Sequence, residues 1–180
     1  GEHDGGVRRV RTRRDGGYRD GSVGNLESLG PACDLLKAGA DVNAKDINQN
    51  TTLMVAVENS NDTSSLDTIK VLIDAGADVN AINNNKWTAL MRVSSYHSTS
   101  SSLNILKMLL DAGADVNVSN ENGVTALMLA ISIITNSFSL DIIKALVDAG
   151  ADINAKTNDG NTPLILAARN SNTHNSFNAF

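Results

Sequence analysis

The sequence predicts an all-α repeat solenoid, built from stacked helix–loop–helix units with β-turn fingers between them. The first observation is a six-residue string, Ala-Gly-Ala-Asp-Val-Asn or its Ile variant, which occurs four times, with its glycine at Gly39, Gly76, Gly113 and Gly150. Each glycine thus follows the previous one by 37 residues, and a threonine and a leucine recur downstream at the same spacing. A fixed period of this length is typical of repeat proteins, in which each unit buries its apolar face against its neighbours.

The two helices of a unit are predicted from the second repeat. The first helix should begin after Thr51, because a threonine hydroxyl accepts a hydrogen bond from an otherwise unpaired N–H at a helix start. Leu53 and Val57 follow at helical spacing. A polar stretch over 58–65 separates this helix from a second one. The apolar stripe of the second helix consists of Leu66, Ile69, Leu72 and Ile73.

The second helix is predicted to stop at glycine and to lead into a turn. Gly76 follows the apolar stripe, and glycine adopts the left-handed conformation without a Cβ clash. Asp78 is expected to accept hydrogen bonds from backbone N–H groups of the following turn. The polar segment 83–85 then predicts a β-turn before the next unit starts.

Leucines at equivalent positions are predicted to form two columns in a core that all units share. The first column consists of Leu53, Leu90, Leu127 and Leu164. The second column starts with Leu35 and continues with Leu72, Leu109 and Leu146.

These motifs resemble the ankyrin repeat over residues 26–180. The resemblance rests on the recurring six-residue string, on Thr-Pro-Leu at 162–164 and on the Leu-Leu pair at 109–110. It implies L-shaped units of two antiparallel helices with a β-hairpin-like finger. Ankyrin units usually have about 33 residues, and the extra residues are predicted to be loop between the two helices, at 60–65, 97–102 and 134–139.

Two departures from the ankyrin pattern carry expectations of their own. Met54, Met91 and Met128 stand where the family usually has histidine, so packing by a flexible thioether should replace a hydrogen bond. The 37-residue, Asn- and Ser-rich units are similar to the ankyrin arrays of amoeba-infecting giant viruses.

The predicted domain organisation is a tail followed by an array. Residues 1–24 contain six of the eight Arg and no Lys or Asn, and this abrupt shift indicates a disordered tail of unrelated origin. The alternative is a basic arm that contacts nucleic acid or an anionic surface. The array of 25–180 divides into a partial first unit at about 25–45, full units at about 46–82, 83–119 and 120–156, and a partial last unit at 157–180, with a first helix over 162–169.

Composition excludes several protein classes. The net charge of −5 is the sum of a basic segment, residues 1–24, and an acidic remainder. The acidic remainder argues against a surface that binds duplex nucleic acid. The lone Cys33 allows no internal disulfide and suits a reducing compartment. It takes the helix position of Lys70, Lys107 and Lys144, which predicts a solvent-facing side chain. No apolar run is long enough to span a membrane, and no signal peptide is evident, so the predicted location is cytoplasmic, in the host cytoplasm if the protein is viral.

No catalytic, cofactor or metal site is predicted, and the protein is not expected to be an enzyme or to take a small-molecule substrate. The histidines, His3, His97 and His174, lie far apart without His or Cys partners at ligand spacing. The four aspartates of the repeated string lie one per unit, too far apart for a paired-carboxylate mechanism.

The ankyrin resemblance implies a non-catalytic scaffold that binds another protein through a concave surface of finger tips and first helices. The residues expected to contact the partner are Ile47, Asn50, Glu58, Asn84, Trp87, Tyr96, Glu121, Val124, Ile133, Asn161 and Arg169. Trp87 and Tyr96 would form an aromatic patch, or Trp87 would simply pack on a neighbouring finger. Two other functions stay open: an adaptor module that recruits targets to ubiquitin-type machinery, and contact with nucleic acid or an anionic surface through the Arg-rich arm.

Overall fold

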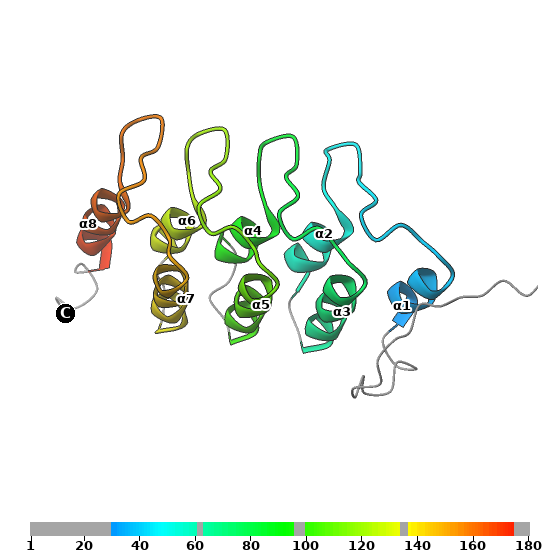
Figure 1. The fold of residues 1–180 in the computed structure, drawn as a ribbon. Coiled ribbons are helices and arrows are strands. Elements are labelled where there is room, and N and C mark those ends of the chain that lie inside the picture. The colour runs from blue at the N-terminus through cyan, green and yellow to red at the C-terminus, as the bar shows by residue number, and fades with distance from the viewer. Residues whose placement is uncertain (1–29, 61–62, 96–99, 134–136, 175–180) are drawn as a thin grey trace, which may run out of the picture.

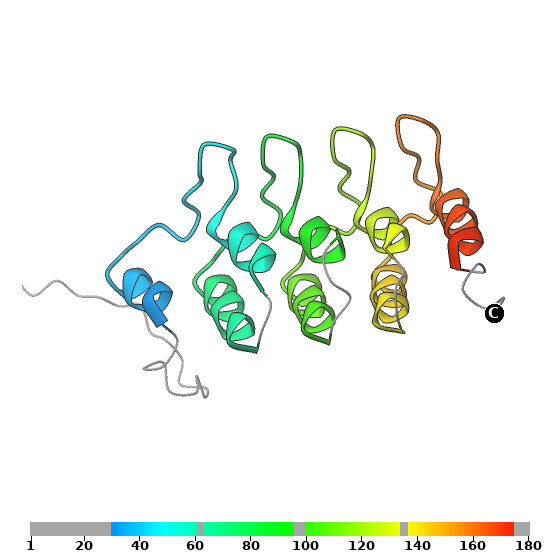
Figure 2. The ribbon, with the colours of Figure 1, turned by 180° about the vertical axis from the view of Figure 1, so that it is seen from behind.

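The fold is an elongated row of stacked helix pairs (Figures 1 and 2). The computed structural model describes residues 30–60, 63–95, 100–133 and 137–174. The helices within these ranges are α1 (Gly30–Lys37), α2 (Thr52–Glu58), α3 (Thr63–Asp74), α4 (Ala89–Ser95), α5 (Ser100–Asp111), α6 (Ala126–Ser132), α7 (Ser137–Asp148) and α8 (Pro163–His174). Within the described part the only β-structure consists of two isolated bridges, Lys45 with Thr51 and Ser119 with Thr125. The predicted all-α repeat solenoid is therefore confirmed.

Each complete unit consists of a first helix and an antiparallel second helix. Helix α2 packs against α3, α4 against α5, and α6 against α7. The first helices α2, α4, α6 and α8 also contact one another in sequence, as do the second helices α1, α3, α5 and α7. Figure 1 shows the first helices in a row nearest the loops that project from the array, with the second helices farther away.

Threonine starts the first helices, as the sequence predicts. The Oγ1 atom accepts a hydrogen bond from the backbone N–H three residues later, in the pairs Thr51–Met54 (3.3 Å), Thr88–Met91 (3.2 Å), Thr125–Met128 (3.4 Å) and Thr162–Ile165 (3.3 Å). Each bond satisfies one of the N–H groups that a helix start leaves without a partner.

Glycine ends the second helices. The φ angles of Gly39, Gly76, Gly113 and Gly150 lie between 87° and 96°, in the left-handed region that favours glycine. In the second unit, the N–H of Gly76 donates to Ile73 (2.9 Å) and that of Ala77 to Leu72 (3.0 Å). These bonds satisfy the last carbonyl groups of α3.

Four helices are longer than predicted. Helices α3, α5 and α7 begin at Thr63, Ser100 and Ser137, so half of each segment expected to be loop is the first turn of a helix. Helix α8 was expected to end near Arg169 but continues to His174. Helices α2, α4 and α6 are each followed by a second helix that packs against them, whereas α8 is the last element that the structure describes.

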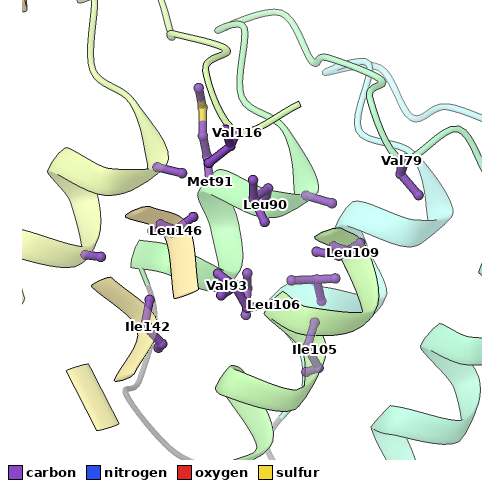
Figure 3. Packing of buried hydrophobic residues seen from close by; sticks show 14 of the residues in the cluster. Val79, Leu90, Met91, Val93, Ile105, Leu106, Leu109, Val116, Ile142 and Leu146 are labelled. Atoms are coloured by element: carbon purple, nitrogen blue, oxygen red, sulfur yellow. The ribbon is translucent and has the colours of Figure 1, made fainter. Parts of the chain in front are cut away.

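The core runs through the units between the two rows of helices. The fully buried side chains include three leucines of each predicted column, Leu53, Leu90 and Leu127 with Leu72, Leu109 and Leu146. Met54, Met91 and Met128 are also buried, as expected for packing by thioethers. Figure 3 shows Leu90 and Val93 of α4 close to Leu106 and Leu109 of α5.

Three side chains at the ends of the array contradict the prediction. Leu164 and Leu35, expected in the two columns, are exposed, whereas Cys33, expected to face solvent, is buried. Equivalent positions in the sequence share an environment only if they have the same neighbours. Among the described residues, α1 packs mainly against α3 and α8 mainly against α6, so both leucines lack neighbours that bury their equivalents in the inner units. This difference does not explain the burial of Cys33.

Candidate functional site

The candidate site is the finger–helix surface, formed by the four finger loops and the first helices α2, α4, α6 and α8. Fingers 1 to 4 are residues 46–50, 83–87, 120–124 and 157–161. In each five-residue finger, the backbone N–H of the first residue donates to the carbonyl oxygen of the fifth residue. The N–H of the fourth residue donates to the carbonyl oxygen of the first, and all these distances are 2.8–3.1 Å. Every finger is therefore a closed β-turn.

The first side chain of each finger organises the loop. Asp46 Oδ1 accepts from the N–H groups of Asn48 and Asn50, both at 2.8 Å. The Oδ1 atoms of Asn83 and Asn120 each accept the two equivalent backbone hydrogen bonds in their own fingers. Thr157 Oγ1 accepts one, from the Asn161 N–H. One acceptor thus holds two donors that the tight turn would otherwise leave unpaired.

The same hydrogen bonds determine the electrostatics of Asp46. The Asn50 side-chain amide donates to Oδ2 at 2.9 Å. This bond, followed by those from the backbone N–H groups of Asn50 and Asn48 and by the charge of Arg92, lowers the pKa of Asp46 below its ordinary value of 3.8.

Neighbouring fingers are joined in pairs at their tips. In fingers 1 and 2, Asn84 donates its N–H to the Asn48 carbonyl (3.0 Å) and its side-chain amide to the Ile47 carbonyl (3.4 Å). Asn158 repeats this between fingers 4 and 3, with bonds to the carbonyl groups of Asn122 (2.9 Å) and Glu121 (2.9 Å). Neither bond joins fingers 2 and 3 in the described part of the chain. The equivalent residue is Glu121, whose carboxylate cannot donate the side-chain bond.

An asparagine ladder links the bases of the fingers. The Asn43 amide donates to the Gly76 carbonyl (3.2 Å) and accepts from the Asp78 N–H (2.8 Å). Asn80 does the same to Gly113 (3.0 Å) and Asp115 (2.7 Å), and Asn117 to Gly150 (3.1 Å) and Asp152 (2.8 Å). Each asparagine therefore clamps the backbone of the following unit. The aspartates of the string bond to the N–H two residues on, as predicted.

A polar cluster on this surface was not predicted from the sequence. The Arg92 guanidinium on α4 forms an ion pair with Glu58 on α2 and donates to Asn50 Oδ1 (2.7 Å), which also accepts from the Asn83 amide (2.9 Å). Arg92 therefore ties two units and a finger together. The signal was available in the sequence, because the equivalent positions hold Val55, Leu129 and Leu166.

The predicted contact residues lie in three settings. Ile47, Asn84 and Glu121 are exposed at the finger tips, whereas Asn50, Trp87, Val124 and Asn161 are half-buried at the finger bases. Glu58, Ile133 and Arg169 lie on or just after the first helices. The Trp87 side chain packs against the core. Tyr96 lies outside the described residues, so the proposed aromatic patch is not seen.

Other features of the sequence find no counterpart in the described residues. There, no group of three or more His, Cys, Asp or Glu could hold a metal ion, and no helix is long and apolar enough to cross a bilayer. The Arg-rich segment 1–24, His3 and His97 lie outside the described part, as does the side chain of His174.

Comparison with known families agrees with this architecture. A family model described as "Ankyrin repeats (3 copies)" matches residues 24–120 and 95–178. No curated protein matches the chain.

Proposed function

Because the chain belongs to the ankyrin-repeat family, whose repeats are protein-interaction modules, we propose that it is a non-catalytic scaffold that binds a partner protein through the finger–helix surface. The observation that carries this proposal is a preformed surface with exposed apolar side chains at one end. Its mechanism is rigid presentation of that surface to the partner.

Preformation is supported by the hydrogen bonds of the fingers. Each finger is closed by its own backbone bonds, and fingers 1 and 2 are also joined at their tips. The cluster around Arg92 connects the same two fingers to helices α2 and α4. A surface held in this way loses little conformational entropy when a partner binds.

The apolar contribution is concentrated on finger 1 and α2. The Ile47 side chain, at the tip of finger 1, is 90% exposed. Val55 on α2 is also exposed. Isolated exposed aliphatic side chains are common, but these two belong to the surface that ankyrin proteins use for binding. They would be covered by the partner.

Trp87 has a structural role that limits its use in binding. Its indole packs against the core, and its backbone N–H donates to Asn83 Oδ1 (2.9 Å). Only the exposed part of the ring is available to a partner. Ile47 is therefore the sharper probe of the binding surface, because replacing it removes no packing within the chain.

The proposed binding takes place inside the cell, in the cytoplasm. The single cysteine of the chain supports a reducing environment. Recruitment of targets to ubiquitin-type machinery stays a prediction, because no described residue bears on it. Contact with nucleic acid through the Arg-rich arm also stays a prediction.

The test compares charge substitutions on and off the finger–helix surface. A partner is first identified by affinity capture with the full chain, and its dissociation constant is then measured by calorimetry. Ile47→Glu should weaken binding at least about tenfold, which corresponds to about 1.4 kcal/mol. Lys107→Glu is the control, because Lys107 is exposed on α5, a second helix. Unchanged affinity of Ile47→Glu, or equal losses in both variants, would contradict binding at this surface.

A further inference from the structure

Fingers 1 and 2 are tied to each other by three hydrogen bonds. Asn84 donates its backbone N–H to the Asn48 carbonyl (3.0 Å) and its side-chain amide to the Ile47 carbonyl (3.4 Å). The Asn83 amide donates to Asn50 Oδ1 (2.9 Å). We call these two loops finger pair 1–2. Its members are joined both at the tips and nearer the helices.

Fingers 3 and 4 form a second tied pair, finger pair 3–4. Asn158 donates its backbone N–H to the Asn122 carbonyl and its side-chain amide to the Glu121 carbonyl, both at 2.9 Å. The two loops are also in close contact, because a Cβ added to Gly123 would lie 3.0 Å from backbone atoms of Thr157 and Asn158. Finger 4 therefore has no room to approach finger 3, and the two hydrogen bonds oppose its moving away.

The boundary between finger 2 (83–87) and finger 3 (120–124), which we call the seam, lacks the bonds at the tips. Within the described residues, no backbone or side-chain hydrogen bond joins these two loops. Glu121 stands where Asn84 and Asn158 donate in the tied pairs. A carboxylate has only acceptors, so it offers nothing to the carbonyl groups of finger 2.

The fifth finger residue also differs at the seam. In finger 1 it is Asn50, whose Oδ1 accepts from Asn83 of finger 2 (2.9 Å). In finger 2 it is Trp87, whose indole has a donor but no acceptor for the amide of Asn120 in finger 3. Two changes in the repeated pattern thus remove the donor at the tip and the acceptor nearer the helices.

The bases of fingers 2 and 3 are nevertheless held together. Asn80, which precedes finger 2, donates to the Gly113 carbonyl (3.0 Å) and accepts from the Asp115 N–H (2.7 Å), and both of these residues precede finger 3. The helices that follow the two fingers, α4 and α6, pack against each other (Figure 1). The two loops are therefore fixed at their bases but, in the described part of the chain, not bonded at their tips. Such an arrangement is a hinge with its pivot at the base.

We propose that the finger tips open and close at the seam, with finger pairs 1–2 and 3–4 as rigid bodies and the bases of fingers 2 and 3 as the pivot. The helix rows keep their packing, because the core and the asparagine ladder continue across this boundary. Opening at the seam breaks no hydrogen bond between fingers of the described chain. Separating the fingers of either tied pair breaks at least two. The seam is therefore the boundary at which opening costs least.

The hinge would let the finger–helix surface adjust to a partner while each finger pair keeps its own shape. This consequence rests on the proposed function, but the hinge itself does not, because it belongs to the free chain. An experiment without a partner therefore tests the hinge alone. Its failure would leave binding at finger 1 and α2 unaffected, and unchanged affinity of Ile47→Glu would leave the hinge unaffected.

Pulsed electron–electron double resonance on the full chain measures the distribution of distances between two spin labels. The finger labels, at Ile47→Cys and Asp159→Cys, occupy exposed positions of fingers 1 and 4 on opposite sides of the seam. The helix labels, at Lys70→Cys and Lys144→Cys, cross the same boundary between units on exposed positions of α3 and α7. Cys33→Ala removes the native thiol from both. The finger labels should give the broader distribution.

Two reciprocal substitutions identify the cause of the opening. Glu121→Asn supplies the missing donor at the seam, so it should narrow the distribution of the finger labels to the width of the helix labels. Asn84→Glu is the reverse change between fingers 1 and 2 and should broaden that distribution further. Both residues are exposed at finger tips, so the helix content measured by circular dichroism should be the same in both variants.

Three results would overturn the proposal. Finger labels with a distribution as narrow as that of the helix labels would mean that the tips do not open. Equal broadening of both distributions would mean that the whole array bends, without a pivot at the finger bases. An unchanged distribution in Glu121→Asn would mean that the missing donor is not what frees the seam.

Discussion

At the scale of single residues, a small set of polar side chains holds the finger loops. Asp46, Asn83, Asn120 and Thr157 occupy the same position in four fingers, and each accepts from backbone N–H groups of its own loop. The position requires an acceptor, whether charged or neutral. Asp46 is the only ionisable member of this set, and its hydrogen bonds lower its pKa.

Stability should therefore depend on pH through Asp46. Its pKa in the folded protein is lower than 3.8, so the ionised form stabilises the fold above the ordinary value. That contribution is lost as the pH falls through the lowered folded value. Asp46→Asn keeps the acceptor but removes the charge. Denaturant unfolding should show the unmodified chain more stable than Asp46→Asn at about pH 7, with the difference vanishing at about pH 2.

The control for this prediction is Asp159→Asn. Asp159 lies in finger 4, is exposed, and accepts no hydrogen bond within the described residues. Its substitution should give a much smaller difference between the two pH values. A stability difference for Asp46→Asn that is constant with pH would show that the charge does not contribute.

At the scale of elements, helices and fingers are determined locally but depend on their neighbours for their environment. The threonine that starts a helix and the glycine that ends one act in the same way in every unit. By contrast, equivalent residues of a finger or a helix meet different surroundings. Two matched pairs of residues separate the local contribution from that of the neighbour.

The first pair compares glycines at the same place in two fingers. Gly123 and Gly160 have φ angles of 74° and 76°. A Cβ on Gly160 would meet nothing within 4 Å, whereas one on Gly123 would lie 3.0 Å from backbone atoms of Lys156, Thr157 and Asn158. Gly160→Ala should cost about 1–2 kcal/mol through backbone strain. Gly123→Ala should cost at least about 1 kcal/mol more. Equal losses of unfolding free energy for the two variants, measured by chemical denaturation, would show that finger 4 shifts to accommodate the added methyl group at no cost.

The second pair compares leucines of one predicted column. Leu90 is fully buried, so Leu90→Ala should lower the free energy of unfolding by about 2–5 kcal/mol. Leu164 is exposed, and Leu164→Ala should change stability by less than about 0.5 kcal/mol. Denaturation midpoints measure both. A large loss in the Leu164 variant would contradict its exposed position.

At the scale of the whole molecule, the units act on one another only through their neighbours. Apolar columns and the asparagine ladder cross each boundary between units. Such an array should gain stability with each interface that is completed. The same interfaces hold the finger–helix surface in place, because the fingers lie at the boundaries between units.

The ladder can be interrupted at one boundary without touching the core. Asn80→Ala removes the bonds to Gly113 and Asp115 and should cost about 1–2 kcal/mol. It should also broaden the unfolding transition, because the units on either side become less coupled. Asn154→Ala is the matched control and should be neutral within about 0.5 kcal/mol, because the Asn154 amide has no hydrogen-bond partner within the described residues. Identical unfolding curves for Asn80→Ala and the unmodified chain would exclude a role for the ladder.

The sequence by itself determined the fold class, the starts of the first helices at threonine, the ends of the second helices at glycine, the turns and the internal core. These features depend on residues close in sequence, and the 37-residue period repeats them so often that the pattern is unambiguous. The finger tips and bases could be assigned to the candidate surface on the same grounds. Its contact residues, such as Ile47 and Trp87, remain predictions, because no period in a sequence identifies a partner.

Only the tertiary structure decided which equivalent residues share an environment. Leu35, Leu164 and Cys33 have regular positions in the sequence but irregular neighbours, so their burial could not be read from the period. The ion pair of Arg92 and Glu58 likewise joins side chains 34 residues apart. The physical reason is that burial and pairing depend on what lies across a boundary between units, and the sequence period does not show which side chains meet there.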